Sequence, residues 1–303
     1  MMFTEFKDTS LLKFVDFFDS DETCLAYLAK YKYSEKYQCK RCGHHHYWNG
    51  QKMARVCKSC RYNESVTANT LFHKLKFSLR KAFYILFEMS TTTKSASSVV
   101  MAQKYEITQK TAWLFMSKVR KAMASSGRFP LTGSCEVDEL LSGGKRKGKT
   151  GRGAANKEKV AVAIEKQGET GVKRMYALRI ANFSAAQLGR LFNQHISLEA
   201  EITTDQWSGY KPLQKDYKIV ALKSEPGENF TLMHRCIQQL KGWIRGIHHA
   251  VSGSYLQGYL DEYCFRFNRH ALKASAFDTL VQRMVGHPPC PKKMLSLSYC
   301  LST

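Results

Sequence analysis

The sequence lacks any run of 18 apolar residues, so it predicts no membrane-spanning helix. Its first residues are acidic and do not show the basic and then apolar pattern of a secretory leader, so we expect no signal peptide. Acidic residues are scarce, because 25 Asp and Glu stand against 47 Lys and Arg and leave a net charge of +22. This excess favours a polyanionic partner, and nucleic acid is favoured over an anionic membrane surface.

Disulfides are not expected either, although the chain has ten cysteines. Without a leader the chain is predicted to stay in the reducing cytoplasm, where cysteines bind metal more often than they form disulfides. Two CxxC pairs stand 14 residues apart, Cys39 with Cys42 and Cys57 with Cys60. Tetrahedral zinc takes four soft ligands, and a CxxC turn lets both thiolates reach one ion. We therefore predict structural Zn²⁺ in a zinc ribbon; unrelated core cysteines and a redox pair are the alternatives.

Aromatic and basic residues accompany the cysteines: Tyr47, Trp48, Arg55, Lys58 and Arg61. They form either a DNA-contacting face or an ordinary solvated surface, and the sequence does not decide between the two.

The length of 303 residues suits two or three domains. Composition and periodicity divide the chain into a helical lead-in (1–30), the zinc ribbon (31–77), a helical segment (78–124), a linker (125–133), a core (134–275) and an irregular tail (276–303). In the core, "CEVDELL", "KVAVAIEK", "RMYALRI" and "EITTD" are typical of strands, and helical patterns follow the last two. The predicted fold class is multidomain α/β.

Residues 95–123, within the helical segment, have the pattern of a helix-turn-helix. Val99, Val100 and Ala102 are expected to face inward on the first helix, and Thr108 is expected to cap the second. The exposed start of the second helix, where a recognition helix meets base edges, carries Gln109, Lys110 and Thr111. An ordinary helical hairpin is the alternative.

Carboxylates in the predicted strands are unexpected in so basic a chain. Strand alternation places Glu136 and Asp138 on one face and Glu139 on the other. Asp205 ends the short strand "EITTD", a place typical of functional sites and of helix caps alike. Carboxylates from neighbouring strands are able to bridge two Mg²⁺ ions, which suits phosphodiester chemistry.

These stretches together resemble the zinc-ribbon transposases of insertion sequences, the ISXO-like family. The resemblance runs from about residue 20 to about 270 and is most specific in "GIHHAVS" followed by "YLDEYCFRFNR". It implies a ribonuclease H-like core, a mixed sheet flanked by helices, that binds Mg²⁺ or Mn²⁺. It also implies cutting and joining of DNA, with the element's terminal repeats and target DNA as partners. Because two ends must be held together, we expect a homodimer or larger assembly.

The resemblance places the catalytic acids on Asp138 and Asp205, and the third position on His234. The family usually has Glu there, often Asn, and in some groups His; Glu228 is the nearest upstream acid and the alternative third ligand. His234 is able to ligate through one ring nitrogen but adds no negative charge. Lys241, two helical turns on, is expected to hold a DNA phosphate.

A Gly-rich basic loop follows the first acid and is expected to grip the DNA backbone without reading sequence. Its basic residues are Lys145, Arg146, Lys147, Lys149 and Arg152. A solvated loop is the alternative. The sequence thus predicts the cytoplasmic, nucleoid-associated transposase of a bacterial insertion sequence. The alternatives are a non-catalytic zinc-ribbon regulator or inactive copy, and a cellular nuclease without a joining step.

Overall fold

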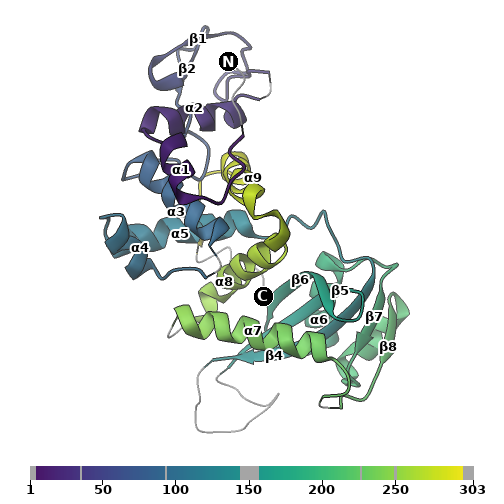
Figure 1. Ribbon diagram of the computed structural model, residues 1–303. Helices are drawn as coiled ribbons and strands as arrows, with labels where there is room; N and C mark the ends of the chain where they lie inside the picture. Colours follow the sequence, from purple (N-terminus) through teal and green to yellow (C-terminus); the bar gives the residue numbers. More distant parts are fainter. Residues whose placement is uncertain are drawn as a thin grey trace. The chain divides into compact units, whose positions relative to one another are not determined.

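The computed structural model describes residues 5–34, 36–92, 94–143, 157–225, 227–248 and 251–295 (Figure 1). The chain forms two compact units, of which the first comprises the chain up to Met123 together with Ala271–Leu295. The second unit begins at Ala124 and continues to His270. Among the described residues, every helix is too short or too polar to span a lipid bilayer.

Helices dominate the first unit: α1 (Leu11–Phe17), α2 (Asp21–Lys32), α3 (Leu79–Thr91), α4 (Ser98–Lys104), α5 (Gln109–Met123) and α9 (Lys273–Gly286), which follows the 3₁₀ turn η4 (His270–Leu272). Serine hydroxyls accept hydrogen bonds from the backbone at the starts of α1, α2, α3 and α4, which satisfies N–H groups that a helix leaves without partners. The helices expected in the lead-in and in the helical segment are therefore confirmed.

An aromatic core holds this unit together. The Phe277 ring of α9 lies 5.1 Å from the Phe14 ring and 5.6 Å from the Phe83 ring, measured between centroids. We expected an irregular tail from residue 276, whereas α9 is a helix as far as Gly286. The reason is long-range packing, because Phe277 is fully buried among rings from the other end of the chain.

The zinc-ribbon segment forms a small antiparallel sheet of β1 (Tyr47–Asn49), β2 (Arg55–Cys57) and β3 (Asn63–Glu64), with the 3₁₀ turn η1 (Gln51–Met53) between the first two strands. Arg55 lies between two rings, with its guanidinium carbon 3.9 Å from the Tyr33 ring centroid and 4.3 Å from that of Tyr47. Arg55 therefore packs within the unit.

A five-stranded sheet is the centre of the second unit, in the order β6-β5-β4-β7-β8. Its elements are β4 (Ser134–Ser142), β5 (Glu158–Gln167), β6 (Gly171–Ile180), α6 (Ala185–His195), β7 (Glu201–Thr204), η3 (Ser208–Lys215), β8 (Lys218–Ala221), α7 (Thr231–Ile247) and α8 (Gly253–Phe267). The first three strands pair antiparallel, and β7 and β8 add parallel to β4. This is the expected mixed sheet flanked by helices, and the four predicted strands are present; β8 was not predicted.

Each face of the sheet buries its own core. Cys135 and Val137 of β4 pack with residues of α6 and η3 on one face. Leu140 packs with α7 and α8 on the other, where α7 crosses the sheet (Figure 1). This alternation is what the sequence predicted for β4, and it places residues 136 and 138 on the α7 face and residue 139 on the α6 face.

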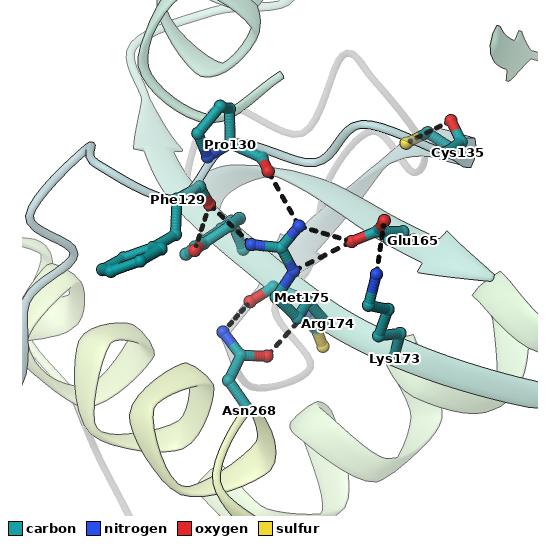
Figure 2. Close-up of polar contacts among 10 residues, drawn as sticks. Phe129, Pro130, Cys135, Glu165, Lys173, Arg174, Met175 and Asn268 are labelled. Carbon is teal, nitrogen blue, oxygen red and sulfur yellow. Dashed lines mark hydrogen bonds and ion pairs between the residues drawn. The ribbon is translucent and has the colours of Figure 1, made fainter. Parts of the chain in front are cut away.

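A half-buried arginine ties the segment before β4 to the sheet (Figure 2). Arg174 donates to the buried carboxylate of Glu165 over 2.8 Å and to the carbonyl oxygens of Phe129 and Pro130 over 2.9 and 2.8 Å. Leu131 then forms a bridge with Ile196. The end of the segment expected to be a linker is thus fixed to the sheet just ahead of the strand that carries Asp138.

Two side chains of the "YLQGYLDEYCFRFNR" motif cover the outer edge of β6. Gln257 accepts from the Arg179 N–H over 2.8 Å and donates to the Ala177 carbonyl over 3.1 Å. Asn268 makes the same pair of bonds with the backbone of Met175, over 2.7 and 2.9 Å. These bonds pair backbone N–H and C=O groups of β6 that would otherwise be free to pair with another strand, so this part of the motif has a structural role.

Candidate active site and zinc site

Three carboxylates meet where β7 ends. The pairing of β4 with β7 stops at Val137 and Thr204, and the next residues are Asp138 and Asp205. Together with Glu139 they form a group in which one carboxylate oxygen from each residue lies within 4.8 Å of the others. The structure therefore brings the two predicted acids together and adds a third that was not predicted.

Backbone hydrogen bonds orient two of these carboxylates. Asp138 accepts from the Glu139 N–H over 2.7 Å, and Asp205 accepts from the Trp207 N–H over 3.0 Å. Such bonds hold the side chains in place before any ligand binds.

Residues of α7 lie beside Asp138. His234 Nε2 is 3.9 Å from Asp138 Oδ2, and the His234 side chain is partly exposed. Burial lowers the pKa of Lys241, and the negative charge of Asp138 opposes that shift, so Asp138 interacts with this lysine as well. Asp138, Asp205 and His234 therefore lie together beside the middle of β4, where β7 ends, and Lys241 is near enough to be affected by the charge of Asp138. The catalytic roles of these four residues stay a prediction. Glu228 is not in the acidic group, within the described residues.

The acidic group suits a divalent ion. Mg²⁺ prefers carboxylate oxygens at about 2.1 Å, so opposite ligands of one ion stand about 4.2 Å apart. The observed 4.8 Å limit needs only a small adjustment of side chains. Glu139 was missed because strand alternation directs it to the face opposite Asp138; β7 ends here, so side chains from both faces reach around its end.

The four predicted zinc ligands are also brought together. Cys39 Sγ lies 3.7 Å from Cys60 Sγ, and Cys42 Sγ lies 3.6 Å from Cys57 Sγ. Tetrahedral ligands at about 2.3 Å from zinc stand about 3.8 Å apart, whereas a disulfide needs about 2.05 Å. The Arg41 N–H donates to Cys39 Sγ over 3.4 Å, as is usual at a thiolate knuckle. The cluster fits zinc and does not fit a disulfide.

The two helices of the predicted helix-turn-helix are present as α4 and α5. Thr108 accepts from the Thr111 N–H over 3.2 Å, which confirms it as a cap. Val99 and Val100 are 51% and 50% exposed, so the expectation that they face inward was wrong. Ala102 is buried as expected, and Met101 rather than the two valines fills the core beside it, because the buried stripe of α4 lies one residue later.

The predicted recognition residues lie at the start of α5. Gln109 donates to Ser98 of α4 over 2.9 Å, Lys110 is exposed, and the Thr111 hydroxyl bonds with that of Thr108. At the start of α5, Lys110 is therefore exposed to solvent, whereas the side chains on either side of it form hydrogen bonds with nearby side chains. Their contact with DNA stays a prediction.

The basic loop residues Lys145, Arg146, Lys147, Lys149 and Arg152 lie outside the described residues.

Glu136 and His248 are placed away from a direct role. Glu136 is buried and pairs with Lys166 over 3.6 Å. His248 packs against Trp243 and Tyr259, with ring centroids 6.0 and 4.1 Å away.

The fold and the acidic site define the second unit as an α/β domain, a mixed sheet flanked by helices, with a candidate divalent-metal centre. Comparison with protein families is more specific: residues 130–268 match the model of the ISXO2-like transposase domain. The match contains the acidic group, His234 and Lys241, and it begins after the zinc ribbon and α4–α5.

Two solved structures are similar to the chain. They are the crystal structures of the Mos1 mariner paired end complex with Mn and of a pre-cleavage Mos1 transpososome. Each is 10% identical, covers 63% of this chain and 75% of its own, and has a TM-score of 0.22 or 0.21 respectively. These scores are too low to show a shared overall arrangement. No curated protein matches this sequence.

Proposed function

We propose that this transposase binds the DNA ends of an insertion sequence and catalyses divalent-metal-dependent strand cleavage and 3′-OH strand transfer. The observation that carries the proposal is the meeting of Asp138 and Asp205 at the end of β7, inside the matched transposase domain. Bound Mg²⁺ or Mn²⁺ would activate the attacking oxygen and stabilise the leaving oxygen.

The chain's own residues have distinct parts in this proposal. Asp138 and Asp205 hold the ions, with their carboxylates already oriented by backbone N–H groups. His234 adds a nitrogen ligand beside Asp138, and Lys241 binds a phosphate on the same side of α7. Water attacks first and the freed 3′-OH attacks next, so no side chain forms a bond to DNA.

The first unit supplies DNA binding in this proposal. The net charge of +22 favours a polyanion, and Lys110 is exposed at the tip of α5. Near the ribbon, Arg61 and Lys58 lie over the Trp48 ring, with distances of 4.7 and 5.9 Å to the centroid. Since Arg55 packs between tyrosines, this second group is the part of the ribbon face that suits a backbone contact.

The test uses DNA that carries the flanking ends of the element, with Mg²⁺ or Mn²⁺ and with the full zinc-loaded chain. We expect wild type to cut the ends and to join pre-cut ends to target DNA. Asp205→Ala should bind the ends but not cut them, and Asp216→Ala, which changes an exposed acid of the same unit, should behave as wild type.

Each alternative has its own outcome. Cutting without joining of pre-cut ends would identify a nuclease. Binding without cutting under either metal would identify a regulator or an inactive copy.

A further inference from the structure

The acidic group raises a question of charge. His234 stands where the family usually has Glu, so α7 brings no negative charge to the site. His234 lies beside Asp138 but does not join the group of three ligand atoms. The third carboxylate of the group comes instead from Glu139, on the same strand as Asp138.

The sheet explains how adjacent residues on one strand reach the same place. Asp138 is on the α7 face and Glu139 is on the α6 face, as the packing of their neighbours Val137 and Leu140 shows. In the middle of a sheet, the next strand would keep two such side chains apart. Here β7 has ended, and one oxygen from each of the Asp138, Glu139 and Asp205 carboxylates lies within 4.8 Å of the others.

A buried tyrosine lies behind Glu139. Tyr210 belongs to the core on the α6 face and is only 1% exposed. Burial raises the pKa of Tyr210, and the charge of Glu139, a side-chain hydrogen-bonding interaction with Glu139 and then the charges of Asp138 and Asp205 raise it further. The hydroxyl thus lies beside Glu139, although its contact with that carboxylate falls outside full hydrogen-bond geometry among the described residues.

A buried hydroxyl without a partner is costly, and native proteins rarely keep one without a reason. Of the nearby carboxylates, Glu139 has the largest effect on the pKa of Tyr210, so we assign it as the acceptor for this hydroxyl. A carboxylate that holds an ion with one oxygen has its other oxygen available for a hydroxyl donor, the usual arrangement around ligating carboxylates.

We propose that Glu139 supplies the third carboxylate of the metal site from β4, with the Tyr210 hydroxyl as its positioning residue, so that Asp138, Glu139 and Asp205 hold the first divalent ion without His234. His234 then serves only the second ion, which it shares with Asp138. This inference rests on the proposed function only for what the bound ions do to DNA; the binding of the ions does not depend on it.

The test measures Mn²⁺ binding without DNA, by calorimetry and by electron paramagnetic resonance, on the full zinc-loaded chain. Wild type should bind a first Mn²⁺ ion. Glu139→Gln should weaken this binding by more than about tenfold, and Tyr210→Phe by about 10- to 100-fold, the range seen when outer partners of ligands are removed. His234→Gln should leave it within about twofold and should weaken only the second ion.

Two controls separate positioning from folding. Tyr210→Phe keeps the ring in its core, so its melting temperature should stay close to that of wild type while its Mn²⁺ affinity falls. Asp216→Asn removes an exposed acid outside the group and should change neither quantity. Glu139→Asp, which keeps the charge on a shorter side chain, should recover part of the affinity lost in Glu139→Gln.

Several results would overturn the inference: no first-ion binding by wild type, unchanged binding in Glu139→Gln, or a loss in His234→Gln as large as in Glu139→Gln. Failure of the proposed function is distinguishable from these. A wild-type chain that binds Mn²⁺ through Glu139 but never cuts DNA would refute that function and leave the metal site standing.

Discussion

Removing the Arg174 side chain should destabilise the second unit strongly, and removing its neighbour Lys173 should not. Both residues bind the same carboxylate, that of Glu165 (Figure 2). Glu165 is 2% exposed, and Arg174 reaches it over 2.7 Å from a largely buried position. Lys173 reaches it over 3.3 Å with a side chain that is 56% exposed.

The expected magnitudes follow from burial. Breaking a buried ion pair by removing one partner costs about 3–5 kcal/mol, because the other charge stays in the protein without compensation. Lys173 still compensates part of it, so we expect about 3 kcal/mol for Arg174→Ala, which also loses the bonds to the carbonyls of Phe129 and Pro130. An exposed pair contributes about 0–1 kcal/mol, which is the expectation for Lys173→Ala.

The assay is amide hydrogen exchange of β4, β5 and β6 at pH 7, because it reports on this unit even if the two units unfold separately. A loss of about 3 kcal/mol corresponds to exchange about 100-fold faster in Arg174→Ala. Lys173→Ala should stay within about fivefold of wild type. Adding Glu165→Gln to Arg174→Ala should recover part of the protection, since it removes the uncompensated charge.

The effect should also depend on pH. Burial raises the pKa of Glu165, but Arg174 and then Lys173 lower it by more, so the folded pKa lies below the ordinary value of 4.5. The pair therefore stabilises the fold above pH 4.5 and loses this effect as pH falls through the depressed folded pKa. Equal losses in Arg174→Ala and Lys173→Ala at pH 7 would refute the reasoning from burial.

Three further predictions concern other parts of the chain. Burial lowers the pKa of His195 to about 4. The free energy of unfolding should therefore be highest above pH 6.5 and fall by about 3 kcal/mol towards pH 4. His195→Phe keeps the stacking on Tyr176 and should lose this pH dependence in unfolding experiments between those pH values. Cys57→Ser should lose bound zinc, measured by atomic absorption, and retention of a full equivalent would contradict the four-thiolate site. Lys110→Ala should reduce the salt dependence of DNA binding by about one unit of slope, whereas Lys94→Ala should not.

Local patterns in the sequence were enough to predict much of this structure. Cysteines at CxxC spacing need only short turns to bring their sulfur atoms together, and the four predicted zinc ligands do form one cluster in the structure. Alternation of apolar residues identified β5 and β6, and a strand that ended in Asp205 identified β7. Because β7 lies beside β4, two acids predicted separately lie together.

Features that depend on distant residues were not predictable from local pattern. Glu139 joins the site because the neighbouring strand ends, and nothing in "CEVDELL" reveals where β7 stops. Tyr210 lies in a short 3₁₀ segment, η3, which was not predicted and which follows the strand that ends before Asp205. Phe277 makes α9 part of the first unit by packing against aromatic rings that are far away in the sequence. Val99 is exposed because the buried face of α4 is shifted by one residue from the face that was expected.

The most direct test of the account is cleavage of end-bearing DNA by wild type and by Asp138→Ala, at protein concentrations where both bind the DNA equally. Asp138 connects the acidic group with α7, because its carboxylate belongs to that group and lies 3.9 Å from His234 Nε2. The account predicts that wild type cuts with Mg²⁺ or Mn²⁺ and that Asp138→Ala binds the DNA but does not cut it. Metal-dependent cutting by Asp138→Ala at the wild-type rate would contradict the proposed active site.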